Sequence, residues 1–234
     1  MVSSEPPPAC RERPWRLTPP SRRAVAGLVV VVAAFIALAV LVALRWSPLI
    51  RVDQAEELAA HRDALAHPWL RAGAVVVTTI GSPLAVDVVT VVVGLILLVG
   101  RRVRAVLYLL VVRLVELGVE TGVKQVMHRP RPTWPDPVAH ASGFSFPSGH
   151  AGGSAAVYGA MLVLALTATR RLARPAAGVL GVLVAVLVAA VATSRVLLGV
   201  HYFSDVTAGI LLGVACLLAA RPLQQLPPPV PHSS

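Results

Sequence analysis

Three short clusters in the 234-residue chain combine cations, histidines and a carboxylate at spacings that suit phosphate chemistry. Together they contribute the candidate site residues Lys124, Arg131, Ser148, Gly149, His150, Arg195, His201 and Asp205. A guanidinium group pairs with phosphate oxygens through two parallel hydrogen bonds, and cations that converge need an anion to neutralise them. We therefore expect Lys124, Arg131 and Arg195 to bind a phosphate group.

The segment Pro147–His150 provides a second device for binding an anion, because it stands directly before a long apolar stretch. Ser148 is expected to be the N-cap of a helix there, and the free backbone N–H groups of a helix N-terminus attract negative charge. Gly149 has no side chain, so the backbone can come close to the anion.

The two histidines are expected to divide the chemistry between them. His201 and Asp205 are four residues apart at the start of a helix, so they share one face of it. The carboxylate can then keep one imidazole nitrogen protonated while the other attacks phosphorus, which makes His201 the nucleophile and Asp205 its orienting partner. His150 is left to protonate the leaving alkoxide and later to activate water, a role for a group that titrates near neutral pH.

The composition places these clusters in a membrane protein, since 56% of the residues are hydrophobic and only 14% are charged. A helix needs about 20 apolar residues to cross the hydrocarbon layer. We expect an all-α bundle of six transmembrane helices, at Ala24–Leu44, Leu84–Gly100, Val103–Val126, His150–Thr169, Ala176–Ser194 and Tyr202–Ala220. The net charge is +10, and the basic residues lie mainly in short clusters between these stretches. Membrane topology explains this distribution better than nucleic-acid binding does.

The segments outside the six spans have other expected roles. Residues 1–21 and 222–234 are expected to be disordered tails, the first of them cytoplasmic, so that 22–221 form the transmembrane domain. Asp53–His67 is polar with Leu58 and Leu65 on one face, which predicts an interfacial helix between the first two spans. Trp69–Ile80 is apolar but short, and a partial seventh span is the competing interpretation.

The positions of the basic residues predict the orientation of the bundle. With six spans, the following arginines all fall on one side: Arg11, Arg13, Arg16, Arg22, Arg23, Arg101, Arg102, Arg104, Arg170, Arg171, Arg174 and Arg221. By the positive-inside rule that side is the cytoplasm. The three chemical clusters then lie together on the extracytoplasmic face of the cell membrane.

These clusters resemble the motifs of the type 2 phosphatidic acid phosphatase family, K-x6-R-P, P-S-G-H and S-R-x5-H-x3-D, and the match extends over roughly residues 84–220. The resemblance implies the six-helix fold and the residue roles given above. It also implies a substrate among the lipid phosphates, since members act on phosphatidic acid, phosphatidylglycerol phosphate or polyprenyl diphosphates such as undecaprenyl diphosphate. The same motifs occur in glucose-6-phosphatases and vanadium haloperoxidases.

The expected function is therefore a membrane lipid phosphatase with a phosphohistidine intermediate and no cofactor. The expected outer loops offer only Asp136 and Asp205 as carboxylates, too few for a magnesium or two-metal centre, so we expect no metal. The alternatives are a non-catalytic protein that binds or transports anionic lipids and, disfavoured by the spans, a haloperoxidase. Membrane lipids are the expected surroundings; neither the oligomeric state nor the particular lipid follows from these motifs.

Several further polar or small residues are expected to serve structure. His128 and His140 are interpreted as surface or capping residues, and Arg129 as part of the basic surface with phosphate contact as the alternative. Ionisable groups within a span should face the bundle interior, which predicts an ion-pair ladder along one stripe of the third span, Arg113, Glu116, Glu120 and Lys124. Close helix packing is expected at Gly118, Gly122, Gly152, Gly153, Gly209 and Gly213.

Overall fold

The computed structural model describes residues 21–168 and 174–225, and within these ranges the chain is helical with no strand. Its elements are α1 (Arg22–Ala43), α2 (Ser47–Ala66), α3 (Pro68–Ile80), α4 (Pro83–Val99), α5 (Val103–Met127), α6 (Gly149–Ala168), α7 (Arg174–Leu197), α8 (Phe203–Ala220) and the 3₁₀ helix η1 (Arg221–Gln225). The predicted all-α class is confirmed. The two expected tails lie outside the described residues, except that Ser21 caps α1 and residues 222–225 belong to η1.

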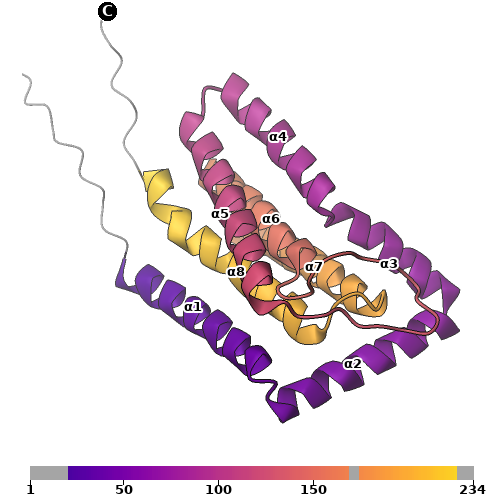
Figure 1. Cartoon of the computed structure of the whole chain (residues 1–234). Helices are drawn as coiled ribbons and strands as arrows, with labels where there is room; N and C mark the ends of the chain where they lie inside the picture. Colours follow the sequence, from indigo (N-terminus) through magenta and orange to yellow (C-terminus); the bar gives the residue numbers. More distant parts are fainter. Residues whose placement is uncertain (1–20, 169–173, 226–234) are drawn as a thin grey trace, which may run out of the picture.

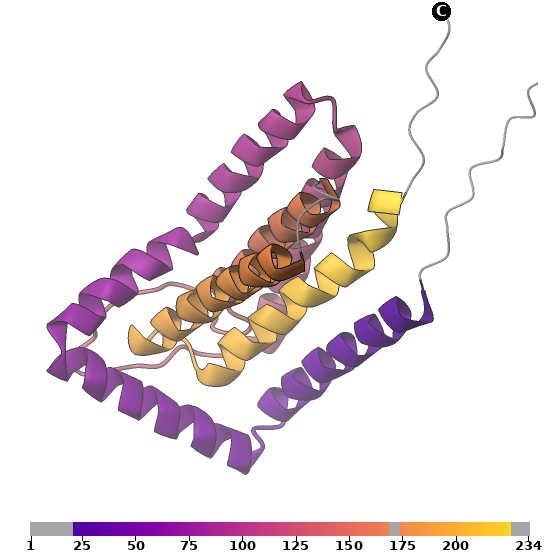
Figure 2. The ribbon, with the colours of Figure 1, turned by 180° about the vertical axis from the view of Figure 1, so that it is seen from behind.

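The helices form an elongated bundle in which α6 packs against α5, α7 and α8, and α1 covers the outer side of α8. Helix α2 runs across one end of the bundle and leads from α1 to α3 (Figure 1). The loop between α5 and α6 lies at that same end, whereas the α4–α5 connection lies at the opposite end (Figures 1 and 2).

By length and composition, α1, α6, α7 and α8 can each cross a membrane, and the bent pair α3 and α4 forms a fifth candidate span. The break in this pair falls at Gly81 and Ser82, where the axis turns by 41°. Residues 69–80 are thus helical and continue towards α4 after a bend. Helix α5 has 25 residues but contains more charged residues than the candidate spans, so its assignment as a sixth span stays a prediction.

Helix α2 turns polar side chains into the bundle and its two leucines outwards. Asp53, Glu57 and His61 are buried, whereas Leu58 and Leu65 are 40% and 51% exposed. Three polar side chains spaced four apart thus point into the bundle, which the sequence analysis did not predict, and the interfacial position of α2 stays a prediction. At a membrane surface the leucines can face lipid instead of the protein core.

Of the six glycines expected at close helix contacts, Gly152, Gly209 and Gly213 have them, Gly153 has ordinary van der Waals contacts, and two meet nothing nearby. In α8, a Cβ atom at Gly213 would lie 2.6 Å from the carbonyl oxygen of Gly152, and one at Gly209 would meet the carbonyl oxygen of Ser148. These glycines therefore let α8 approach the backbone of α6. Gly118 and Gly122 were wrongly expected to pack, because a Cβ atom at either would meet nothing within 4 Å among the described residues.

The ionisable residues of α5 form two ion-paired groups. Arg113 lies 2.6 Å from Glu116 and 2.7 Å from Asp87 of α4, and Lys124 lies 2.5 Å from Glu120. The predicted ion pairing within α5 is confirmed. Asp87 joins it from the neighbouring helix, so that this charge cluster also ties α4 to α5.

We expect Gly213→Ala to destabilise the protein by about 1–3 kcal/mol, because the added methyl group would overlap the α6 backbone and force the two helices apart. Gly118→Ala is the matched control, since the same methyl group meets open space there. The measurement is the unfolding midpoint of both purified variants in one detergent. Equal midpoints for Gly213→Ala and Gly118→Ala would contradict the close α6–α8 contact.

Candidate active site

The structure brings the three clusters together at the end of the bundle where α2 and the α5–α6 loop lie (Figure 1). Lys124 lies in the last turn of α5, Arg131 in the following loop, His150 in the first turn of α6, Arg195 in the last turn of α7, and His201 shortly before α8. His150 interacts electrostatically with the other four residues. Residues up to 77 positions apart in the chain thus share one site.

His201 and Asp205 are paired in the way that their spacing predicts. His201 Nδ1 lies 3.3 Å from Asp205 Oδ2, and both side chains are buried. The other ring nitrogen, Nε2, lies 2.8 Å from Nη1 of Arg131. Since a guanidinium group can only donate, Nε2 is the acceptor and the ring proton is assigned to Nδ1. In this tautomer Nε2 carries the lone pair.

Burial lowers the pKa of His201 to about 4, against the opposing hydrogen bond and negative charge of Asp205. The ring is therefore neutral at pH 7. A neutral imidazole whose lone pair points away from its carboxylate partner has the electronic form required of a nucleophile.

The three cations that are predicted to bind phosphate differ in how many of their donor atoms already have a partner in the protein. Lys124 is ion-paired with Glu120, while Arg195 donates from Nη1 to Thr78 Oγ1 at 2.8 Å. The Nε atom of Arg195 is buried and has no hydrogen-bond partner among the described residues. An unpaired buried donor is costly, so this atom is suited to bind an anion.

Arg131 organises the loop that covers the site. Its guanidinium group donates to the carbonyl oxygens of Ser142, Gly143, Phe144 and Val200, at 2.8–3.2 Å, in addition to His201. Burial lowers the pKa of Arg131 from its ordinary value, but an arginine remains charged at neutral pH. The guanidinium group therefore joins the α5–α6 loop to the α7–α8 connection beside His201.

Ser148 and Gly149 occupy different environments from those expected. Ser148 Oγ is buried without a hydrogen-bond partner in the described part of the chain, so its side chain does not cap α6. Its backbone N–H instead donates to the carbonyl oxygen of Asp205 at 3.0 Å. Gly149 lies against Glu120, whose carboxylate a Cβ atom would meet. The absence of a side chain at Gly149 lets α6 approach the carboxylate that holds Lys124.

Arg129 has a role that the sequence reasoning missed. It is 9% exposed and forms ion pairs with Asp205 and with Asp53 of α2, so it does not belong to a basic surface. Asp53 lies 76 positions away, and no motif connects the two residues. The spacing of Asp53, Glu57 and His61 could have revealed a buried polar face on α2, because residues four apart share a helix face.

His128 and His140 follow the interpretation as surface or capping residues. Both are exposed, and His128 is the C-cap of α5, in the left-handed region, with its ring edge-on to Phe144. Trp134 stacks on His61 of α2 with the ring centroids 3.7 Å apart. Among the described residues, no group of three or more His, Cys, Asp or Glu side chains is arranged to hold a metal ion.

Comparisons with known proteins identify the family of this chain. The model of the PAP2 superfamily matches residues 104–226. Phosphatidylglycerophosphatase B of Bacillus subtilis (strain 168) is 31% identical over 153 residues, which cover 63% of this chain and 71% of that protein.

Two solved structures share the fold. The crystal structure of the first transmembrane PAP2 type phosphatidylglycerolphosphate phosphatase from Bacillus subtilis superposes with a TM-score of 0.76 at 26% identity, covering 85% of this chain and 96% of that one. The structure of Aquifex aeolicus LpxE has a TM-score of 0.53 at 18% identity, covering 66% of this chain and 87% of that one, and shows the fold alone. The chain belongs to the PAP2 superfamily and is a multi-pass membrane phosphatase of the PAP2 type.

Proposed function

We propose that this phosphatase hydrolyses a phosphomonoester or diphosphate of a lipid through a phosphohistidine intermediate on His201. The observation that carries the proposal is the position of His201, held between Asp205 and Arg131 at the end of a membrane helix bundle. Candidate substrates are phosphatidic acid, phosphatidylglycerol phosphate and undecaprenyl diphosphate. The name of the Bacillus subtilis relative makes phosphatidylglycerol phosphate the first to test.

In the first step, Nε2 of His201 attacks phosphorus while the bond from phosphorus to the leaving-group oxygen breaks. For a monoester that oxygen belongs to the lipid alkoxide. His150, which enters this step protonated on both ring nitrogens, gives one proton to the oxygen as it leaves and becomes neutral. In the second step, His150 takes a proton from water, the water oxygen attacks phosphorus, and the phosphorus–nitrogen bond breaks. Inorganic phosphate leaves and both histidines return to their starting forms.

The positive groups around the histidines stabilise the phosphoryl group in transit, which in phosphoryl transfer supplies much of the rate. Lys124, Arg131 and Arg195 are assigned to the phosphate oxygens, together with Ser148 and the backbone at Gly149. The unpaired Nε of Arg195 and Oγ of Ser148 support this assignment, because both are buried polar atoms that lack a partner among the described residues.

The site is assigned to the extracytoplasmic face. This assignment rests on the arginines at the opposite end of the bundle, where Arg101 and Arg102 lie between α4 and α5. A lipid phosphate in the outer leaflet would then present its headgroup to the site while its chains remain in the membrane.

Replacing the nucleophile should abolish turnover. We expect His201→Ala to reduce kcat on the order of 1,000-fold or more, since the covalent route is lost. The measurement is phosphate release from the three candidate lipids in one detergent system, together with trapping of an acid-labile phosphoprotein. His140→Ala is the control, because that histidine is exposed in the same loop region. Unchanged activity in His201→Ala would exclude the phosphohistidine route.

Hydrolysis should need no metal ion. Phosphate release by the wild-type protein is expected to be the same in a chelator as in added magnesium, because guanidinium and ammonium groups take the place of the cation. The measurement is the initial rate after dialysis against chelator. A rate that collapses and is restored by one divalent cation would contradict metal independence.

The orientation can be measured by labelling single cysteines. In a Cys10→Ser, Cys216→Ser background, His140→Cys should react in intact cells with a maleimide that cannot cross the membrane. Arg101→Cys should react only after the membrane is opened, because it lies at the cytoplasmic end. The reverse pattern would place the site on the cytoplasmic side.

A further inference from the structure

Helix α2 places a buried carboxylate, that of Asp53, next to the residues that hold Asp205. Asp53 is 1% exposed, although it belongs to a helix at the end of the bundle. A buried carboxylate is expensive unless it is paired and hydrogen-bonded. The partners of Asp53 therefore indicate why α2 carries it.

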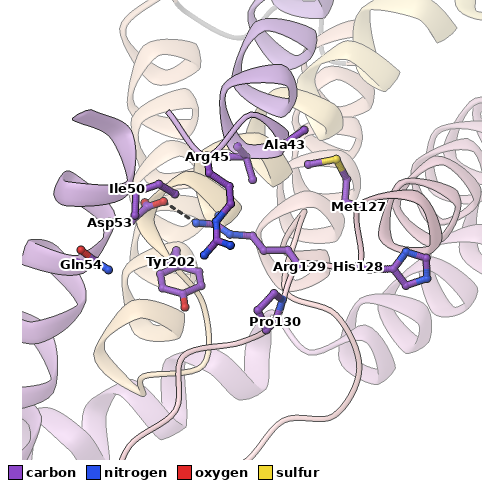
Figure 3. A pocket seen from close by; sticks show the side chains of 11 residues that line it. Ala43, Arg45, Ile50, Asp53, Gln54, Met127, His128, Arg129, Pro130 and Tyr202 are labelled. Carbon is purple, nitrogen blue, oxygen red and sulfur yellow. Dashed lines mark hydrogen bonds and ion pairs between the residues drawn. The ribbon is translucent and has the colours of Figure 1, made fainter. Parts of the chain in front are cut away.

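The principal partner is Arg129, which connects Asp53 to Asp205. Arg129 Nη2 lies 2.7 Å from Asp53 Oδ2, and Arg129 Nη1 lies 2.5 Å from Asp205 Oδ1. Figure 3 shows the guanidinium group of Arg129 reaching Asp53 above the ring of Tyr202. The Tyr202 ring lies 4.2 Å from Arg129 Cζ, which adds a cation–π contact.

Ser204 closes this network. Its hydroxyl group donates to Asp53 Oδ2 at 2.6 Å and accepts from Arg129 Nη1 at 2.7 Å. Its backbone N–H donates to Asp53 Oδ1 at 2.9 Å. Because Ser204 lies in the first turn of α8, Asp53 acts as a cap for this helix from outside it. The first turn of α8, which presents Asp205 to His201, is thus fastened to α2.

The charges of the network determine how strongly Asp205 acts on His201. Burial alone would lower the pKa of Arg129, but the carboxylates of Asp205 and Asp53 outweigh it and raise the pKa, so the guanidinium stays charged. Because the single charge of Arg129 is shared between two carboxylates, it does not fully neutralise Asp205. The remaining negative charge of Asp205 acts on the Nδ1–H group of His201.

We propose that Asp53 and Arg129 are positioning residues for the phosphatase reaction, which fix the carboxylate of Asp205 and divide the charge of one guanidinium group between two carboxylates. This inference rests on the proposed role of His201 as nucleophile. Neither residue contacts His201 directly, and both Nη atoms of Arg129 are engaged by protein acceptors. Arg129 is accordingly assigned to Asp205 and not to the substrate phosphate.

A cavity of about 280 Å³ borders this network on the side of α1 and α2. Arg45, Gln54 and His128 line it together with Asp53 and Arg129 (Figure 3). The Asp53–Arg129 pair therefore separates this cavity from Asp205.

Other charged groups also affect the pKa of His201 and of Asp205. The loss of the Asp53 charge must therefore be compared with the loss of one negative charge at another position. The titratable or charged groups around His201, Asp205 and the adjacent His150 are Asp53 and Glu57 of α2, Lys124 of α5, Arg129 and Arg131 of the loop, His150 itself, Arg195 of α7, and Tyr202 before α8. Burial, and then the charge of Asp53, raise the pKa of Glu57 to about 7.

The test is Asp53→Asn, which keeps the shape of the side chain and removes its charge. We expect kcat to fall about 10- to 100-fold with KM within twofold of the wild type, since the phosphate-binding cations are untouched. Arg129 would then pair with Asp205 alone and weaken its stabilisation of protonated His201. His201 attacks only when neutral, so the acidic limb of kcat/KM should move to lower pH.

Glu56→Gln is the matched control, because it removes the same charge from an exposed position on α2. A second readout needs no substrate: the ring ¹⁵N shifts of His201 should report the Nδ1–H tautomer in the wild type and a mixture of tautomers in Asp53→Asn. If the wild type releases no phosphate from any lipid, the proposed function fails, and the ¹⁵N shifts still test the positioning.

A folded Asp53→Asn protein with wild-type kcat, an unmoved acidic limb and unchanged ¹⁵N shifts would overturn the inference. If Asp53→Asn does not fold, Ser204→Ala removes one link of the network with less disturbance. We expect Ser204→Ala to lower kcat several-fold with its unfolding midpoint retained. Wild-type kcat and ¹⁵N shifts in this variant would equally overturn the inference.

Discussion

The arrangement at the end of the bundle depends on one buried carboxylate, that of Asp205, which is completely inaccessible to solvent. A buried charge requires hydrogen bonds and an opposite charge. Asp205 obtains them from the His201 ring, from the backbone N–H of Tyr202 at 3.0 Å, and from Arg129. These three partners belong to the α7–α8 connection, the start of α8 and the α5–α6 loop, so satisfying one carboxylate assembles the site.

Close helix packing brings the second histidine to the same place. Gly209 lets α8 approach the first turn of α6, where the N–H of Ser148 donates to the carbonyl oxygen of Asp205. The backbone bond fixes the start of α6 relative to the start of α8, and His150 and His201 belong to these two starts. Side chains larger than hydrogen at this crossing would separate the helices, and with them the two imidazoles.

The sequence predicted the helices and the assembly of the cationic cluster because both have local signals, namely apolar length and motif spacing. It did not predict the inward face of α2. Leu58 and Leu65 indicated an interfacial helix, in which lipid can cover the leucines, but they gave no sign that Asp53 needs a partner inside. The Asp53–Arg129 pair has no local signal, since it joins a helix and an irregular loop 76 positions apart. Similarly, no spacing indicates that Gly149 lies against Glu120.

Arg131 connects substrate binding to the reactivity of the nucleophile under the proposed chemistry. Its Nη1 atom donates to the lone pair of His201 Nε2, which cannot attack phosphorus while this hydrogen bond persists. A phosphate oxygen is a stronger acceptor than an imidazole nitrogen, because it carries charge. Binding of the substrate phosphate would therefore draw the guanidinium group from the ring and expose the lone pair beside phosphorus. The nucleophile would become available only when an anion is present.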